Sequence, residues 1–151
     1  MIVSPNRTSC LIESLVELWD ASVRASHHFL TDENIRNLTL FVRDALFEID
    51  TLLVAYEHNH PIGFIGIEVL KIEMLFVSPD YFGKGFGKCL VKQAVEQYGV
   101  IYVDVNEQNP KALGFYNSLG FKGFDRTKVD GQGNPFPIIK MKLEFLDTQV
   151  K

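Results

Sequence analysis

The sequence has few cysteines, and their spacing suits neither a metal site nor a redox motif. Only two of the 151 residues are cysteine, Cys10 and Cys89, and they lie far apart in the chain. This pattern excludes a disulfide framework, a CxxC redox centre and a paired-cysteine zinc site. We therefore expect two reduced thiols, as in a cytoplasmic protein, and no bound metal.

The sequence also lacks an excess of basic residues and any long apolar run. Lysine and arginine number 15 against 19 aspartate and glutamate, which gives a net charge of −4. A protein that coats duplex nucleic acid usually presents a basic face. No window approaches the roughly 20 apolar residues of a membrane-spanning helix, and the first residues lack the apolar core of a signal peptide. We expect a cytoplasmic protein with no nucleic acid and no membrane as partner.

No internal repeat, low-complexity tract or linker divides the chain. Its length suits one compact domain, and 46% apolar residues, with 12 phenylalanines, can fill a core without crosslinks. We therefore predict a single domain over residues 1–151.

Hydrophobic periodicity predicts an alternation of helices and strands. Helices are expected over 9–26, from 31 to about 46, over the segment that ends at Tyr98, and from 109 to about 119. Strands are expected over 51–56, 61–68, 72–77, 100–105, 121–128 and 136–145, with a further short strand at 2–3. Such an order predicts an α+β fold, with one mixed sheet covered by helices on both faces.

A glycine-rich segment, SPDYFGKGFGK at 78–88, lies between an expected strand and the next helix. Its three glycines, Gly83, Gly85 and Gly87, keep side chains away from a backbone that enters a helix N-terminus. Free N–H groups and the helix dipole at such a place bind phosphate, and Lys84 and Lys88 add positive charge. The spacing matches neither the P-loop nor the dinucleotide-binding fingerprint. The segment nonetheless predicts a phosphate or pyrophosphate site.

A second segment, NPKALGFYNSLGF at 109–121, predicts a helix with Asn109 as N-cap and proline in its first turn. Together the two segments resemble the GCN5-related N-acetyltransferase (GNAT) superfamily. Gly85 and Gly87 match its loop Q/R-x-x-G-x-G/A, and the second segment matches N-x-x-A-x-x-x-Y-x-x-x-G-F, with Tyr116 as its tyrosine. One position departs from the family pattern, because Phe82 stands where the family has Gln or Arg.

The resemblance spans about residues 52–143 and carries expectations about the fold and the cofactor. It implies a mostly antiparallel mixed sheet in which two parallel strands, 72–77 and 100–105, splay apart. It also implies acetyl-CoA as acyl donor, with the pyrophosphate on the glycine loop and the pantetheine arm along the preceding strand. The implied cofactor-binding residues are Leu75, Phe76, Val77, Phe82, Gly83, Lys84, Gly85, Phe86, Gly87, Lys88, Asn109, Ala112 and Phe115.

The implied reaction is direct transfer of the acetyl group to a primary amine of a small molecule, a peptide or a protein. Tyr116 matches the family tyrosine that protonates the leaving thiolate. Glu73 is a candidate for the base that takes a proton from the amine. Glu68, His27, His28 and water remain open alternatives for the base.

The segment between the first two expected helices, which contains His27, His28 and Phe29, is predicted to contact the acceptor. The resemblance leaves both a monomer and a homodimer open. Two other functions also stay open: a non-catalytic acyl-CoA sensor or partner-binding module on the same fold, and a phosphate-binding domain without acyl chemistry. Tyr116 favours the enzyme, whereas Phe82 and the choice among several bases favour the sensor.

Overall fold

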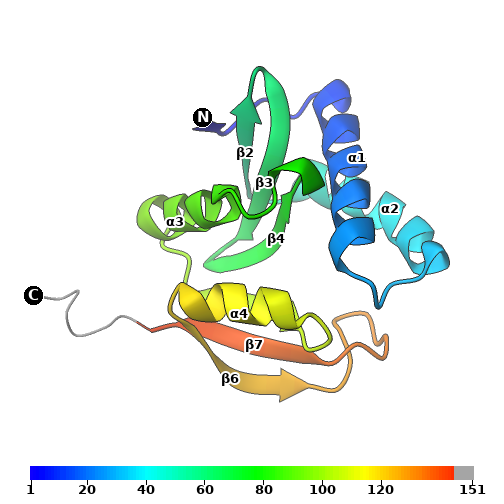
Figure 1. The fold of residues 1–151 in the computed structure, drawn as a ribbon, viewed down its shortest axis with the longest axis vertical. Helices are drawn as coiled ribbons and strands as arrows, with labels where there is room; N and C mark the ends of the chain where they lie inside the picture. The colour runs from blue at the N-terminus through cyan, green and yellow to red at the C-terminus, as the bar shows by residue number, and fades with distance from the viewer. Residues whose placement is uncertain (145–151) are drawn as a thin grey trace, which may run out of the picture. The chain divides into compact units, whose positions relative to one another are not determined.

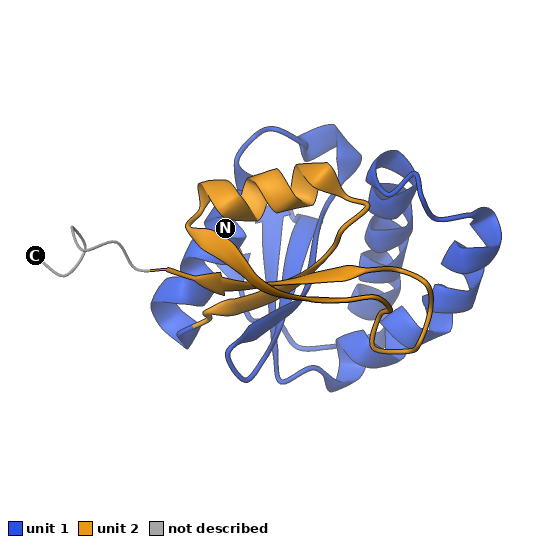
Figure 2. Ribbon diagram, turned by 90° about the horizontal axis from the view of Figure 1, so that it is seen from below, with its two compact units in different colours: residues 1–99 blue, residues 100–151 orange. Residues whose placement is uncertain are grey.

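The computed structural model describes residues 1–144, which form two compact units, Met1–Gly99 and the residues from Val100 onward (Figures 1 and 2). The first unit contains β1 (Ile2–Val3), α1 (Ser9–Ser26), α2 (Asp32–Glu48), β2 (Thr51–Glu57), β3 (His60–Glu68), β4 (Lys71–Val77), a 3-10 turn (Pro79–Tyr81) and α3 (Phe86–Tyr98). The second contains β5 (Tyr102–Asn106), α4 (Pro110–Ser118), β6 (Phe121–Thr127) and β7 (Ile138–Leu143). No helix within residues 1–144 is long and apolar enough to cross a membrane.

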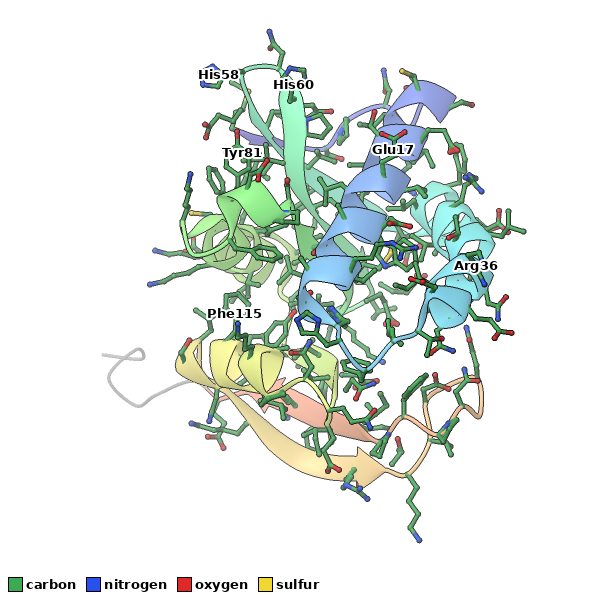
Figure 3. The ribbon with its side chains drawn as sticks, turned by 45° about the vertical axis from the view of Figure 1, so that its right-hand side comes forward. Glu17, Arg36, His58, His60, Tyr81 and Phe115 are labelled. Atoms are coloured by element: carbon green, nitrogen blue, oxygen red, sulfur yellow. The ribbon has the colours of Figure 1, made fainter. Side chains whose placement is uncertain are left out.

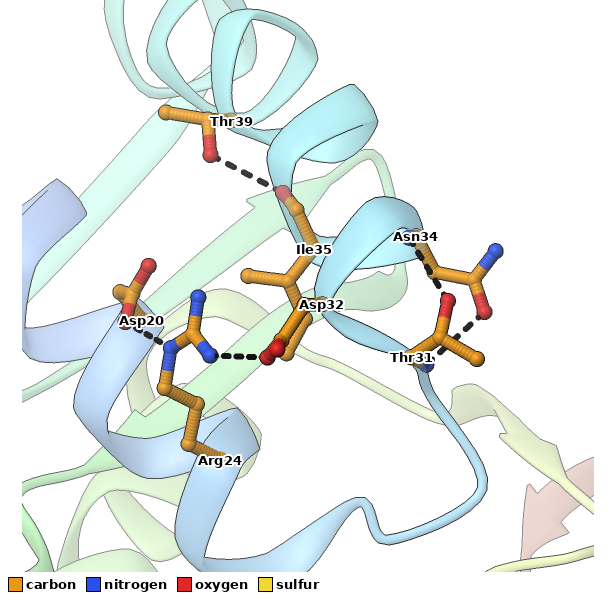
Figure 4. A network of polar contacts seen from close by, with 7 residues as sticks. All are labelled: Asp20, Arg24, Thr31, Asp32, Asn34, Ile35 and Thr39. Carbon is orange, nitrogen blue, oxygen red and sulfur yellow. Dashed lines mark hydrogen bonds and ion pairs between the residues drawn. The ribbon is translucent and has the colours of Figure 1, made fainter.

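The connection between α1 and α2 is fixed at both ends by polar contacts (Figure 4). Thr31 Oγ1 accepts from the amide of Asn34, and Asn34 Oδ1 accepts from the amide of Thr31, each at 3.0 Å. This reciprocal pair is a capping box and confirms the predicted N-cap. Arg24 donates to Asp20 at 2.7 Å and to Asp32, in the first turn of α2, at 2.6 Å. The short segment between the helices is therefore held between two anchored helix ends.

Strands β1 to β4 form an antiparallel sheet in which β2 and β3 are the central strands of the first unit. The register places Val54 opposite Phe64, and Phe64 opposite Phe76. Helices α1 and α2 pack on one face and α3 on the other, so both faces of the central strands are buried. The apolar core between the sheet and α1 and α2 consists of Ile12, Leu15, Val16, Leu18, Trp19, Val23, Ile35, Val42, Leu46, Ile49, Leu52, Val54 and Phe64.

One irregularity interrupts the pairing of β3 with β4. Gly66 lies opposite Met74 and Ile67 lies opposite Ile72, which leaves Glu73 without an opposite residue. A bulge of this kind bends the strand and redirects the side chain of the extra residue. The regular alternation on which the sequence placed Glu73 is therefore broken at this residue.

In the second unit, β7 pairs antiparallel with both β5 and β6, and α4 packs on β6. Helix α4 begins as predicted, with Asn109 as N-cap and proline at the first position. The β6–β7 connection is organised by Asp130, whose carboxylate accepts from the amides of Gln132 and Asn134 at 2.9 Å each. The predicted last strand, 136–145, is shorter in the structure, and its final residue, Phe145, lies outside the described residues.

The predicted order of helices and strands is confirmed in both units. The boundaries differ by two residues at the start of β5, which was expected from residue 100 and begins at Tyr102, and by two residues at each end of β7. The chain divides into two compact units, and a single domain over 1–151 stays a prediction.

Candidate functional site

The glycine loop leads from β4 into α3 through a backbone that only glycine adopts easily. Gly83 has φ +73° and Gly85, the N-cap of α3, has φ +88°. An L-residue pays roughly 1–2 kcal/mol in this left-handed region. A Cβ at either glycine would meet nothing within 4 Å. The backbone conformation, and not crowding by neighbouring atoms, therefore requires glycine here, and the space beside the loop is open.

The N-terminus of α3 presents amides that the helix itself does not use. Its first intrahelical bond runs from the amide of Cys89 to the carbonyl of Gly85 at 3.0 Å. The amides of Phe86, Gly87 and Lys88 precede that bond, and Gly85 has no side chain that could cap them. Aligned amides at the positive end of a helix dipole form a site for an anion.

Lysine and aromatic side chains surround this helix terminus. Tyr81 is labelled in Figure 3. Lys84 Nζ lies 5.3 Å from its ring centroid, and Phe86 contacts the same ring edge-on, with ring centroids 5.6 Å apart. Lys88 is exposed in the first turn, and Phe82 is 41% exposed. The structure thus brings the predicted loop residues from Phe82 to Lys88 together around one helix N-terminus, with an apolar ring where the family has a polar side chain.

The predicted cofactor strand, β4, carries Leu75, Phe76 and Val77 as half-buried residues. Phe76 packs against Phe64 at 5.7 Å between ring centroids and joins the core beneath α1. Leu75 and Val77 pair with Ile65 and Gly63 of β3. A Cβ at Gly63 would come within 3.2 Å of the Phe76 carbonyl oxygen, so glycine allows β3 to lie this close to β4.

Glu73, a candidate base, lies exposed at the bulge of β4. Its carboxylate is 3.6 Å from Lys71 Nζ. The pKa of Glu68 is raised, first by desolvation and then by the nearby carboxylates of Asp50 and Glu73. Glu68 and Glu73 therefore belong to a group of surface carboxylates at the end of β3 and the start of β4.

His27 is the C-cap of α1, and its ring is half-buried between two phenylalanines. Ring centroids lie 5.5 Å apart for His27 and Phe29, and 6.0 Å apart for His27 and Phe76. Burial, and then the neighbouring His28, lower the pKa of His27, so its imidazole is neutral at pH 7. His28 itself is exposed. The structure thus places a residue predicted to contact the acceptor beside Phe76, which is predicted to contact the cofactor.

Two serines that the sequence analysis did not single out hold this histidine. His27 Nδ1 is 2.8 Å from Ser26 Oγ, and Ser26 Oγ is 2.7 Å from the carbonyl oxygen of Ser22. Ser22 is a buried polar residue, 3% exposed. In the sequence, the only pattern that points to these serines is their spacing, with Ser22 four residues before Ser26 and Ser26 directly before His27.

Asn109 fulfils its structural role in the second unit, because its Oδ1 accepts from the amide of Ala112 at 3.1 Å. Its predicted contact with the cofactor stays a prediction. Ala112 and Phe115, the latter labelled in Figure 3, are both half-buried on α4. The ring of Phe115 lies edge-on to that of Tyr116, with centroids 5.0 Å apart.

Tyr116 has a buried ring and a hydroxyl that keeps its proton. The residue is 6% exposed, and Phe121 contacts its ring edge-on at 5.6 Å. Desolvation by burial raises the pKa of Tyr116, so the phenol is protonated at neutral pH. The backbone carbonyl of Tyr116 accepts from the amide of Leu119 at 3.1 Å, and within residues 1–144 no fully buried side-chain oxygen lacks a hydrogen-bond partner.

Comparisons with known proteins agree with these features. The family model of the acetyltransferase (GNAT) domain matches residues 48–123. The peptidyl-lysine N-acetyltransferase YjaB of Escherichia coli K12 is 37% identical over 129 residues, which cover 85% of this chain and 88% of that protein.

Solved structures extend the likeness to nearly the whole chain. The solution structure of apo YjaB from Escherichia coli has a TM-score of 0.85 at 35% identity and covers 97% of this chain and 99% of that one. The PaiA N-acetyltransferase of Thermoplasma acidophilum, solved in complex with coenzyme A, has a TM-score of 0.71 at 22% identity and covers 96% and 99%. These matches confirm the predicted GNAT-like α+β fold. The chain belongs to the GNAT superfamily and is an N-acetyltransferase, as its glycine loop and its tyrosine helix together predicted.

Proposed function

We propose that this enzyme transfers the acetyl group of acetyl-CoA to the side-chain amine of lysine in a peptide or protein. The proposal of a lysine acceptor is based on one observation. The Escherichia coli relative that is 37% identical over 85% of this chain is named a peptidyl-lysine N-acetyltransferase. A cytoplasmic location stays a prediction.

The donor is proposed to bind with its pyrophosphate on the N-terminus of α3. The amides of Phe86, Gly87 and Lys88 supply hydrogen-bond donors, and the side chains of Lys84 and Lys88 supply charge. The pantetheine arm is proposed to lie along Leu75–Val77 in the manner of an added strand. Phe82 offers the cofactor an apolar surface in place of a polar contact.

The chemistry requires two proton transfers. A base first converts the lysine ammonium to a neutral amine, whose nitrogen lone pair attacks the thioester carbonyl carbon. The new C–N bond forms and the C–S bond breaks, while the oxyanion that develops between these events needs fixed N–H donors. Tyr116 gives its phenolic proton to the leaving sulfur, and the second proton of the amine nitrogen restores the phenol through solvent. The protonated state of the buried Tyr116 phenol supports this role.

The charge of the loop lysines gives a prediction for cofactor binding. Replacing Lys84 or Lys88 with glutamine should weaken coenzyme A binding a few-fold each, because an exposed charge pair contributes about 0.2–1 kcal/mol. The loss should shrink as salt is raised, since exposed charges are screened. Isothermal titration at low and high salt measures both effects. Lys92, exposed one turn further along α3, provides the matched control Lys92→Gln. An equal loss for this control would contradict the proposed pyrophosphate position.

A panel of acceptors tests the proposed function. The purified protein is given acetyl-CoA with a lysine-containing peptide, a peptide whose only amine is its N-terminus, or a small polyamine. We expect the highest kcat/KM with the lysine peptide. Preferential turnover of the polyamine or of the N-terminal amine would overturn the acceptor class. Acetyl-CoA binding without turnover of any amine would favour the acyl-CoA sensor.

A further inference from the structure

Helix α2 carries large apolar side chains on the face that points away from the core. The outer face of a surface helix is usually polar. On α2, however, Leu40 is 68% exposed, Phe41 is 57% exposed and Phe47 is 42% exposed. Helix formation does not require these residues, because glutamate, glutamine and lysine have helix propensities at least as favourable as that of phenylalanine. The core does not require them either, since the inner face of α2 supplies its buried residues, Ile35, Val42 and Leu46.

Helical geometry brings these three apolar side chains into one patch. Leu40 and Phe47 are two turns apart, so they lie on the same side of α2, about 10 Å from each other along its axis. Phe41 is adjacent to Leu40 and lies on the flank of that line. Several large apolar side chains gathered on one exposed face mark an interaction surface, whereas a single exposed leucine has no such meaning.

Carboxylates lie among the apolar side chains of this face. Glu33, Asp44 and Glu48 are all exposed and share the outer side of α2 with Leu40, while Arg36 contributes one positive charge (Figure 3). Glu17, exposed on the neighbouring helix α1, adds a further negative charge (Figure 3). We call Glu33, Leu40, Phe41, Asp44, Phe47 and Glu48 the outer face of α2. An apolar surface with a negative rim is complementary to a segment that is both apolar and cationic.

The outer face of α2 begins beside the proposed donor site. The ring of Phe29, in the connection that leads into α2, lies 5.5 Å from the ring of His27, which lies 6.0 Å from the ring of Phe76 on β4. The acyl donor is proposed to lie along this part of β4. Helix α2 has 17 residues and is therefore about 25 Å long. A chain segment that continues from the reacting lysine can thus run along the helix.

We propose that the outer face of α2 is a docking surface for a cationic amphipathic segment of the acceptor protein, close in sequence to the lysine that is acetylated. This inference rests on the proposed function, because it takes a lysine-bearing protein as acceptor. The apolar side of the segment covers Leu40, Phe41 and Phe47, and its cationic side chains pair with the carboxylates between them. The docking surface acts on the affinity for the acceptor and leaves the chemical step unchanged.

A second copy of this chain fits the same surface less well. An α2 helix packed on another α2 helix would bring Glu33, Asp44 and Glu48 toward the same three carboxylates of the partner. Like charges placed opposite one another across an interface are unfavourable. The charge of the outer face of α2 therefore favours a cationic partner over self-association.

A pair of peptide substrates tests the docking surface. One peptide has a blocked N-terminus and a single lysine. The other carries the same sequence, extended through a glycine–serine linker of about six residues, which spans up to about 20 Å, by a segment of arginine and leucine at helical spacing. We expect the extension to lower KM about tenfold, as a few buried apolar anchors do, and to leave kcat unchanged. An extension of glutamate and leucine should not lower KM, and high salt should reduce the gain from arginine.

Variants of α2 locate the effect. In the double variant Leu40→Gln with Phe41→Gln, the arginine extension should no longer lower KM. The KM of the short peptide and the affinity for acetyl-CoA should remain at the wild-type values and show that the variant is folded, since glutamine favours a helix. Phe124→Gln is the matched control, because Phe124 on β6 is also 57% exposed, and it should keep the full gain.

The outcomes separate this inference from the proposed function. A short lysine peptide that wild type does not acetylate would overturn the proposed function. A short peptide that is acetylated, with a KM that the arginine extension leaves unchanged, would overturn the docking surface alone. A gain that survives in the double variant, or that the glutamate extension also gives, would overturn it as well. Sedimentation of wild type as a dimer that the double variant dissociates would assign the outer face of α2 to a second copy and contradict the proposal.

Discussion

Replacing Tyr116 with phenylalanine is expected to lower kcat by about 10²–10⁴-fold, the range for removal of a general acid. The affinity for acetyl-CoA should change by less than about twofold, because the substitution removes one oxygen and leaves the ring packed on Phe115 and Phe121. The buried phenol holds its proton at neutral pH, as a donor to the thiolate must. Steady-state kinetics and calorimetric titration of the same preparation measure the two quantities.

A matched control separates the hydroxyl of Tyr116 from tyrosine hydroxyls in general. Tyr98, 37% exposed at the end of α3, also loses one hydroxyl in Tyr98→Phe, and we expect unchanged kcat. If Tyr116→Phe weakened acetyl-CoA binding as much as it slowed turnover, Tyr116 would be a binding or structural residue. Unchanged kcat in Tyr116→Phe would show that another group protonates the thiolate.

The second large effect is expected from Gly85→Val at the start of α3. Gly85 has φ +88°, and an L-residue in this left-handed region costs roughly 1–2 kcal/mol. Valine there should lower the free energy of unfolding by at least this amount. Shifting the helix N-terminus would also displace the amides of Phe86, Gly87 and Lys88. A hydrogen bond to a charged group contributes about 1.5–3 kcal/mol, so the loss of one such bond to the pyrophosphate should weaken coenzyme A binding about 10- to 100-fold. Urea denaturation measures the first effect, and titration with coenzyme A the second.

Asparagine at the same position shows whether the backbone is the cause. Asparagine tolerates the left-handed region better than valine does, so Gly85→Asn should retain more of the stability. No neighbouring atom lies within 4 Å of a Cβ there, so both side chains have room. Equal stability of the valine and asparagine variants would contradict the conformational explanation. Wild-type affinity for coenzyme A in Gly85→Val would contradict the assignment of the pyrophosphate to this helix terminus.

The parts of the fold that sequence predicted are those determined locally. Thr31 and Asn109 are helix caps because their side chains bond amides three residues further on, a relation visible in any sequence. The glycine loop was recognisable for the same reason, since Gly83 and Gly85 meet a backbone requirement of their own segment. The role of Tyr116 was predicted from its spacing to Asn109 and from the family motif.

The structural features that the sequence did not predict depend on contacts between segments that are distant in the chain. The bulge at Glu73 arises from the register of β3 against β4, which strict alternation does not reveal. The contact of His27 Nδ1 with Ser26 Oγ is local, but the burial of His27 depends on Phe76, which lies far along the chain. The sequence therefore put Glu73 forward as a candidate base and left Glu68, His27, His28 and water open, and the surroundings that differ among these residues come from the packing.

The most direct test of the proposed lysine acetylation is the position of the acetyl group on a peptide. A peptide with a blocked N-terminus and one lysine is incubated with acetyl-CoA and the enzyme, and fragment masses locate the modification. We predict one acetyl group on the lysine Nζ, formed by wild type and strongly reduced with Tyr116→Phe. A peptide that stays unmodified while the same enzyme preparation acetylates a small amine or a free N-terminus would contradict the proposal.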